Sequence, residues 1–156
     1  NADKIKSFVL GGHGDTMVAM LNHTFIEGKP IKELINQGKI SQKDLDAIIE
    51  RTQKGGAEIV KYLEKGSAFY APAAAGVEMA ESYIKDLKKE LPCAAYLNGE
   101  YGAKDIYAGV PVIIGKNGVE KIVEIGLSSE EKEKFDKSIK AVQDLFHAAK
   151  KIDTSL

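Results

Sequence analysis

The most constraining feature of the sequence is a histidine set among glycines directly after an apolar segment. Residues 5–10 alternate loosely between apolar and polar types, which predicts a β-strand, and Gly11, Gly12 and Gly14 then surround His13. Because glycine has no Cβ, a substrate or another part of the protein can approach this backbone closely. An unperturbed imidazole has a pKa of ~6.5 and exchanges a proton readily near neutral pH. The stretch therefore predicts either a strand end that presents a catalytic imidazole or a glycine-rich turn with an incidental histidine.

Composition restricts the class of protein. The chain has 156 residues, of which 44% are hydrophobic, so we expect one globular domain spanning residues 1–156. Its 22 basic and 23 acidic residues nearly cancel, which argues against nucleic acid or an anionic membrane as a partner. No apolar run approaches the ~18 residues of a membrane span, and no leader opens the chain. The single cysteine, Cys93, fits a reducing compartment, so we expect a soluble, cytoplasmic protein.

The first half of the chain predicts short strands followed by helices. Residues 17–26 read as an extended strand interrupted near Asn22, and Pro30 can open a short helix over residues 31–37. Ser41 begins a capping box, and the apolar stripe behind it predicts the longest helix of the chain, which begins at Ser41 and is ended by Gly66.

Two features of these helices bear on function. The pair Gly55-Gly56 inside the long helix predicts a kink or close packing, including packing against another subunit. After the loop 67–72, Pro72 is placed at the first position of a helix that reaches about Glu90, where Pro92 stops it. The small residues of the first turn of that helix predict either tight packing on a sheet or the wall of a pocket.

The last third predicts an antiparallel meander followed by a helix. Strands are expected at 94–98, 110–115 and 119–125, and Asn117-Gly118 is a hairpin signal between the last two. Tyr101 and Tyr107 are expected to cover the edge of this sheet. Ser128 begins a second capping box, followed by a helix with one apolar face, and His147 on that helix is expected to be solvated. The fold class predicted is α+β, an antiparallel twisted sheet with long helices packed on it.

The sequence does not favour a metal site. His23 could join His13 and Asp15, but ten residues separate the two histidines and no Cys/His cluster supports coordination.

Several motifs together resemble one enzyme family. Residues 9–18, Val-Leu-Gly-Gly-His-Gly-Asp-Thr-Met-Val, resemble the catalytic-histidine motif of the lactate/malate dehydrogenase family, in its lactate-dehydrogenase-like branch of NAD-dependent malate dehydrogenases. The resemblance continues through residues 28–31, through Gly-Ser-Ala-Phe-Tyr-Ala-Pro-Ala at 66–73, and through Gly-Val-Pro-Val-Ile-Ile-Gly at 109–115. It covers nearly the whole chain but only the carboxy-terminal, substrate-binding half of the family. Ala19 departs from the family pattern, which usually has proline there.

The resemblance implies a function and a set of site residues. It implies reversible oxidation of malate to oxaloacetate with NAD, in which His13 accepts or donates the substrate proton. It places Asp15 as structural support of the loop, because the family takes its orienting carboxylate from elsewhere. The residues implied as walls of the pocket for substrate and nicotinamide are Gly12, Met17, Ser67, Ala68, Ala71 and Pro72.

Missing features predict that this half does not act alone. The chain has no Gly-x-Gly-x-x-Gly motif for a dinucleotide, and its one arginine, Arg51, cannot clamp both carboxylates of malate. The chain also begins at Asn1 without an initiator methionine. We therefore expect that an amino-terminal dinucleotide-binding domain is absent, that this domain binds most of NAD, and that the fragment alone is inactive.

Two other functions remain open at this stage. The chain could be the carboxy-terminal domain of a lactate dehydrogenase, although that branch more often has Gly-Glu-His-Gly-Asp-Ser. It could also be a non-catalytic oligomerisation module that uses the glycine-containing helix. A homo-oligomer is expected in either dehydrogenase case.

Overall fold

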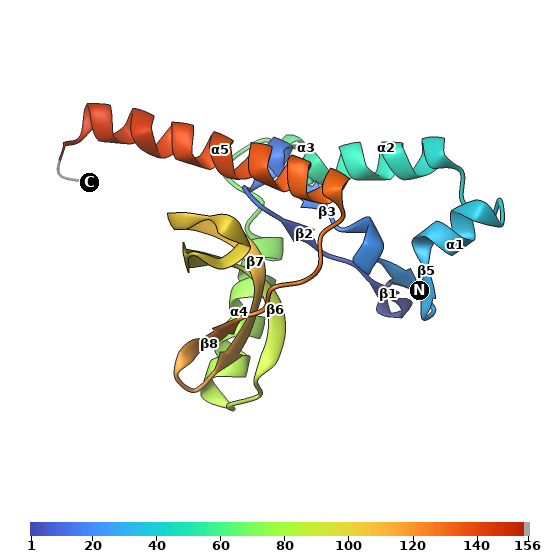
Figure 1. Ribbon diagram of the computed structural model, residues 1–156, viewed down its shortest axis with the longest axis horizontal. Helices are drawn as coiled ribbons and strands as arrows, with labels where there is room; N and C mark the ends of the chain where they lie inside the picture. Colours follow the sequence, from blue (N-terminus) through green and yellow to red (C-terminus); the bar gives the residue numbers. More distant parts are fainter. Residues whose placement is uncertain (155–156) are drawn as a thin grey trace.

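The computed structural model describes residues 1–154 and has three small antiparallel sheets and five α-helices within that range (Figure 1). The strands are β1 Ile5–Lys6, β2 Val9–Leu10, β3 Val18–Ala19, β4 Phe25–Ile26, β5 Lys29–Pro30, β6 Lys89–Asn98, β7 Lys104–Gly115 and β8 Gly118–Ile122. The helices are α1 Ile31–Asn36, α2 Gln42–Gln53, α3 Gly55–Leu63, α4 Tyr70–Ile84 and α5 Ser129–Ile152. The strand orders are β1-β4-β5, β2-β3 and β6-β7-β8. Over residues 1–154, none of the helices combines the length and apolar character needed to cross a membrane.

The core lies between the β6-β7-β8 sheet, the β2-β3 pair and α5, which runs across the top of the molecule in Figure 1. Alternate side chains of β7 point to one face of its sheet, as the two-residue period of a strand requires. The apolar side chains on that face are nearly inaccessible: Ile106, Ala108, Val110, Val112 and Ile114. Phe135 of α5 and Leu10 of β2 complete the cluster. The predicted α+β class is confirmed.

Local signals with a strong stereochemical basis predicted their elements correctly. β7 and β8 form the expected hairpin, with Gly118 at a φ of +87°. Ser41 caps α2 by accepting a hydrogen bond from the backbone N–H of Asp44, and Ser128 caps α5 through a complete capping box. The long helix predicted from Ser41 divides at Lys54 into α2 and α3, so the longest helix is α5.

The boundaries predicted for the fourth helix were wrong. α4 begins at Tyr70, so Pro72 is its third residue rather than its first, where it still has no intrahelical N–H bond to lose. The helix ends at Ile84 rather than near Glu90, and Asp86 and Lys88 then take left-handed φ values of +49° and +52°.

Pro92 does not end a helix but lies inside β6. β6 is an edge strand of its sheet, a position that tolerates proline. Its register partner across the ladder is Pro111, so the two positions without an N–H donor face each other. Pairing of Lys89 with Ile114 starts this ladder, and a long-range pairing of that kind leaves no periodic signal in the sequence.

Two further expectations were wrong. The strand predicted over residues 5–10 is divided between two sheets, because β1 pairs with β4 whereas β2 pairs with β3. Tyr101 does not cover the sheet edge but is buried against Phe135, and its hydroxyl donates to the carbonyl of Val123 at 2.6 Å. Tyr107 lies on the central strand β7 rather than on an edge strand, and its exposed ring packs against Tyr96 of β6.

Glu131 connects the beginning of α5 to the short turn Leu21–His23. Its carboxylate is buried and accepts hydrogen bonds from the backbone and side chain of Asn22 and of Ser128. Burial raises the pKa of Glu131, but these hydrogen bonds outweigh burial and hold the pKa below its ordinary value. The carboxylate is therefore ionised in the folded state and stabilises the junction between the two segments.

We predict that Glu131→Gln lowers the free energy of unfolding at pH 7 by about 1–3 kcal/mol, because the backbone and side-chain donors of Asn22 and Ser128 lose a charged acceptor. The pKa of Glu131 is lowered by folding, so its contribution is present above the unfolded-state pKa of about 4.3 and is lost as pH falls through the folded-state pKa. Urea unfolding at pH 7 and at pH 3 measures the difference in unfolding free energy between the unsubstituted chain and Glu131→Gln. This difference should be smaller at pH 3.

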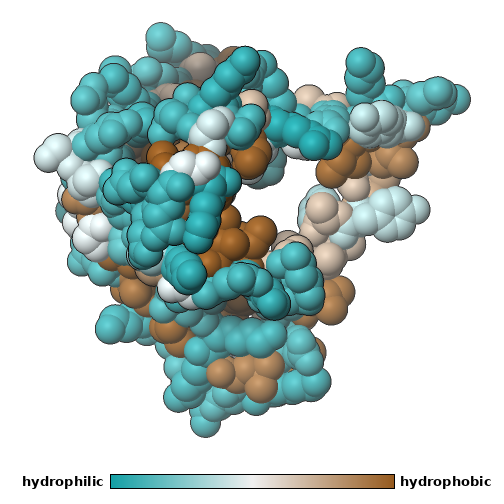
Figure 2. All heavy atoms as spheres, turned by 90° about the vertical axis from the view of Figure 1, so that its right-hand side faces the viewer, coloured by the Kyte–Doolittle hydropathy of each residue, from teal (hydrophilic) through white to brown (hydrophobic). Residues whose placement is uncertain are grey.

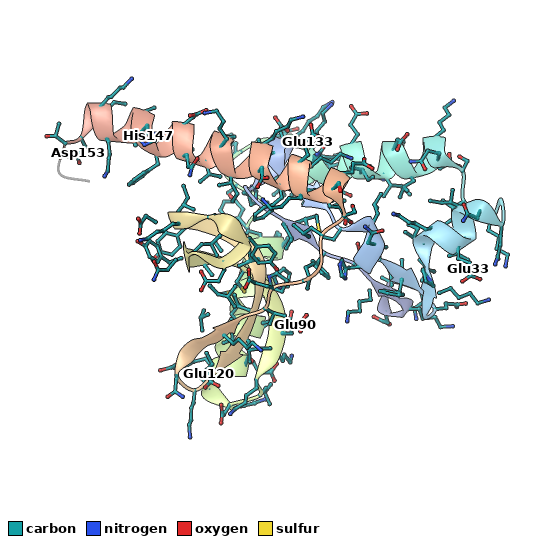
Figure 3. The ribbon with its side chains drawn as sticks, in the orientation of Figure 1. Glu33, Glu90, Glu120, Glu133, His147 and Asp153 are labelled. Atoms are coloured by element: carbon teal, nitrogen blue, oxygen red, sulfur yellow. The ribbon has the colours of Figure 1, made fainter. Side chains whose placement is uncertain are left out.

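Glu133→Gln is the matched control for this experiment. Glu133 is exposed on the same helix and forms a surface ion pair with Lys137 (Figure 3), so its substitution should leave the free energy of unfolding nearly unchanged. Equal effects of the two substitutions would contradict the role given to Glu131.

Candidate functional site

His13 lies on a loop, residues 11–17, which we call the histidine loop and which is joined to the β6-β7-β8 sheet by backbone hydrogen bonds. Gly11 follows β2 and forms a reciprocal pair with Gly109 of β7, with N···O distances of 2.8 and 2.7 Å. His13 has extended backbone geometry (φ −82°, ψ 145°), directly before the turn Gly14–Thr16. The imidazole is exposed, and within residues 1–154 it has no hydrogen-bond partner. The loop therefore presents the ring to solvent from a backbone that is fixed on one side.

Two glycines at this junction leave no room for a side chain. A Cβ on Gly109 would lie 2.9 Å from the carbonyl oxygen of Gly11. A Cβ on Gly11 would lie 2.3 Å from Oγ of Ser138, and Gly11 has a φ of +91°. Glycine is therefore required at position 109 for β2 to reach β7, and at position 11 for α5 to pack against the loop.

The imidazole opens onto a cleft of about 770 Å³ between the histidine loop, α3 and the start of α4. The structure brings Asp15, Met17 and residues 67–72 to this cleft. The predicted wall residues that line it together with His13 are Met17, Ser67, Ala68, Ala71 and Pro72. Gly12 is separate from them: it lines a neighbouring hollow of about 580 Å³, on which His13 and Met17 also border.

Sequence reasoning missed the wall that α2 and α3 contribute. Gln53, Lys54, Gly56 and Val60 line the cleft, and the break between the helices at Lys54 brings them there. A Cβ on Gly56 would meet nothing within 4 Å, so this glycine borders open space rather than close backbone packing. The glycine pair was the signal for this wall, although it was interpreted as a kink or a subunit contact.

Charges of both signs border the cleft. The pKa of the Lys54 ammonium is raised chiefly by its hydrogen bond to Glu50, and the nearby carboxylate of Asp15 adds to this effect. Asp15 is exposed, and in the described part of the chain no hydrogen bond joins it to His13. Arg51 lies outside the cleft and donates two hydrogen bonds to Glu58, at 2.9 and 2.7 Å.

The other histidines lie elsewhere. Nε2 of His23 is 2.8 Å from the carbonyl oxygen of Gly126, and His147 is exposed on the C-terminal part of α5 (Figure 3). Over residues 1–154, no group of three or more His, Cys, Asp or Glu side chains is placed to hold a metal ion.

Comparison with known proteins identifies the family. The family model that describes the lactate/malate dehydrogenase α/β C-terminal domain matches residues 1–152 of this sequence. The chain belongs to this family. It is 61% identical over 153 residues to a malate dehydrogenase of Pelagibacter ubique, a match that covers 98% of this chain and 48% of that protein. The chain thus spans about half the length of the curated relatives it matches.

Solved structures of family members have the same fold. The crystal structure of Cryptosporidium parvum malate dehydrogenase matches with a TM-score of 0.93 and 43% identity, over 97% of this chain and 48% of that one. The crystal structure of lactate dehydrogenase from Eimeria maxima with NADH and oxamate matches with a TM-score of 0.93 and 40% identity, over 99% of this chain and 48% of that one.

We predict that Gly109→Ala destabilises the chain by about 1–3 kcal/mol, because its methyl group would overlap the Gly11 carbonyl and force the histidine loop away from β7. Urea unfolding measures the loss. Gly76→Ala is the control: Gly76 lies inside α4, and a Cβ there would meet no atom within 4 Å, so alanine should stabilise the helix by up to about 1 kcal/mol. If Gly109→Ala leaves the free energy of unfolding unchanged, the junction has room for a methyl group and this interpretation is wrong.

Proposed function

We propose that this chain is the substrate-binding, proton-transferring half of a NAD-dependent malate dehydrogenase. The observation that carries the proposal is His13, an exposed imidazole that has no hydrogen-bond partner within residues 1–154 and lies at the edge of a cleft lined by small and apolar residues. The motif around His13 and the curated malate dehydrogenases at 54–61% identity support malate and oxaloacetate as the substrates.

The proposed step at His13 is a proton transfer. During oxidation, a neutral imidazole accepts the proton of the C2 hydroxyl of malate as the C–H bond at the same carbon breaks. During reduction, the imidazolium returns the proton to the keto oxygen and polarises it beforehand. NAD, when bound, supplies the hydride acceptor and donor. Because none of the described residues forms a hydrogen bond with the imidazole of His13, its ring nitrogens can bind the substrate.

The cleft is suited to a small acid and one edge of a flat ring. Its volume of about 770 Å³ lies within the usual range of small-molecule sites. Gly14 has no side chain, and Ala68, Ala71 and Ala75 place short side chains on the walls, so a planar ring can approach the backbone there. We propose Met17, Ser67 and Pro72 as further residues of this cleft, Gly12 as a pocket residue through the neighbouring hollow, and Asp15 as support of the loop.

A second half is proposed to supply the remaining groups. Malate has two carboxylates, which guanidinium forks bind in a bidentate manner, but the only arginine is already committed to Glu58. We propose that an amino-terminal dinucleotide-binding domain, which precedes this half in a full-length enzyme, binds most of NAD and contributes the arginines. The isolated chain is then inactive.

A chimera provides the test. This chain is joined behind the amino-terminal half of the Pelagibacter ubique malate dehydrogenase, with the intact relative as control. We expect NAD-dependent turnover of malate, and turnover lowered at least about 100-fold in the His13→Asn variant, which removes the general base while NAD still binds. A folded chimera that binds NAD but turns over no malate, or a His13→Asn variant with normal turnover, would refute the proposal.

Lactate is the competing substrate. The likeness to the Eimeria maxima lactate dehydrogenase, solved with NADH and oxamate, favours a 2-ketoacid of either kind. The malate dehydrogenases at higher identity favour oxaloacetate. Assays of a full-length protein with oxaloacetate and with pyruvate distinguish the two, and a preference for pyruvate would favour the lactate dehydrogenase alternative.

We also propose that the protein is a homo-oligomer in a reducing, cytoplasmic compartment. Large apolar side chains on α3 and α4 are exposed in the single chain, among them Tyr62, Tyr70, Val77 and Ile84 (Figure 2 shows apolar residues at the surface on one side). Cys93 is a free, buried thiol, as expected where disulfides are not formed. Sedimentation of the chimera at several concentrations tests assembly, and a concentration-independent monomer would exclude it.

A further inference from the structure

The histidine loop is held at its two ends by side chains from two different helices. At its beginning, the backbone N–H of Gly12 donates a hydrogen bond of 2.8 Å to Oγ of Ser138, which lies on α5, 126 residues away in sequence. Ser138 is only 2% exposed, so water does not replace this acceptor.

The second contact is a hydrogen bond at Met17, the last residue of the histidine loop. Nε2 of Gln53 donates a hydrogen bond of 3.0 Å to the carbonyl oxygen of Met17. Gln53 is the last residue of α2, directly before the break at Lys54, and it also lines the cleft onto which His13 opens. The contact therefore joins the histidine loop to the opposite wall of the cleft.

We propose that Ser138 and Gln53 are positioning residues for His13 in the proposed proton transfer, on which this inference rests. The imidazole has no hydrogen bond of its own in the described part of the chain, so its place depends on the backbone that carries it. That backbone contains Gly11, Gly12 and Gly14, which allow many conformations in the absence of external contacts. Ser138 and Gln53 restrict this freedom on both sides of the ring.

The packing around Ser138 supports a fixed geometry. A Cβ on Gly12 would lie 3.0 Å from Cγ2 of Val142 and 3.5 Å from Oγ of Ser138, both on α5, so the loop is closely fitted to that helix. Ser138→Ala keeps the Cβ and removes only the acceptor of the Gly12 N–H. Gln53→Glu keeps the length of the side chain, removes the donor to Met17 and adds a negative charge.

The chain offers matched controls for both substitutions. Ser82 is also buried, at 0% exposure, and its hydroxyl bonds the backbone of Ile114 and Lys89, away from the histidine loop. Gln42 lies on α2, as Gln53 does, but donates to Asp46 on the surface. Ser82→Ala and Gln42→Glu therefore reproduce the chemical changes without touching the loop.

Steady-state kinetics in the chimera test the proposal. Ser138→Ala and Gln53→Glu should lower kcat by roughly tenfold to a hundredfold, because small displacements of a reacting group cost about this much. KM should stay nearly unchanged in Ser138→Ala, which adds no charge to the cleft. The two control variants should keep kcat near that of the unsubstituted chimera, although Ser82→Ala should lose stability in urea as Ser138→Ala does.

Hydrogen exchange on the same chimera gives a second measurement that does not depend on turnover. The amide of Gly12 should exchange at least about tenfold faster in Ser138→Ala and not in Ser82→Ala. If Ser138→Ala does not fold, Gln53→Glu, at a partly exposed position, carries the kinetic test alone.

The outcomes separate this inference from the proposed function. Normal kcat in Ser138→Ala and Gln53→Glu, together with an inactive His13→Asn, overturns the positioning role and leaves the proposed function intact. Normal turnover in His13→Asn overturns both. Equal losses of kcat in Ser138→Ala and Ser82→Ala also overturn the positioning role, because the effect would then follow stability alone.

Discussion

The reciprocal backbone hydrogen bonds between Gly11 and Gly109 are the constraint on which the arrangement of this domain depends. They attach the end of β2 to the middle of β7, so the two-stranded β2-β3 sheet is joined to the β6-β7-β8 sheet. The approach leaves no room for a Cβ on Gly109, and Ser138 of α5 leaves none on Gly11. His13 follows two residues later, and the position of its backbone is thereby tied to the most buried strand of the molecule.

Around this junction, polar contacts between distant segments complement a modest apolar core. Ser138 binds the start of the histidine loop, Gln53 binds its end, and Glu131 holds the beginning of α5 against the turn at Asn22. Each of these groups satisfies backbone donors or acceptors that would otherwise be left without partners. The helix α5 thus contributes both the apolar face around Phe135 and the polar groups that place the loop. The cleft is a consequence of these contacts, since its walls come from segments that meet only in the folded chain.

Local stereochemistry explains which elements were predictable. The serine caps of α2 and α5 and the glycine of the β7-β8 hairpin act within a few residues, so their patterns are readable in the sequence. The end of α4 was mispredicted because apolar residues continue at helical spacing through Leu91, whereas pairing of β6 with β7 takes those residues into a strand. Tyr101 was misplaced for a related reason: its burial depends on Phe135, more than thirty positions along the chain.

The candidate site divides in the same way. The sequence by itself determined that His13 stands among glycines after a strand, that small residues lie near the beginning of the helix that follows Ser67, and that the motifs resemble those of a dehydrogenase. Only the tertiary structure decided that these two segments form one cleft, that Gln53 and Lys54 complete it, and that Gly12 faces a different hollow. The reason is physical: glycines specify what a backbone is allowed to do, but contacts across 36 and 126 residues of chain select which of the allowed conformations is occupied.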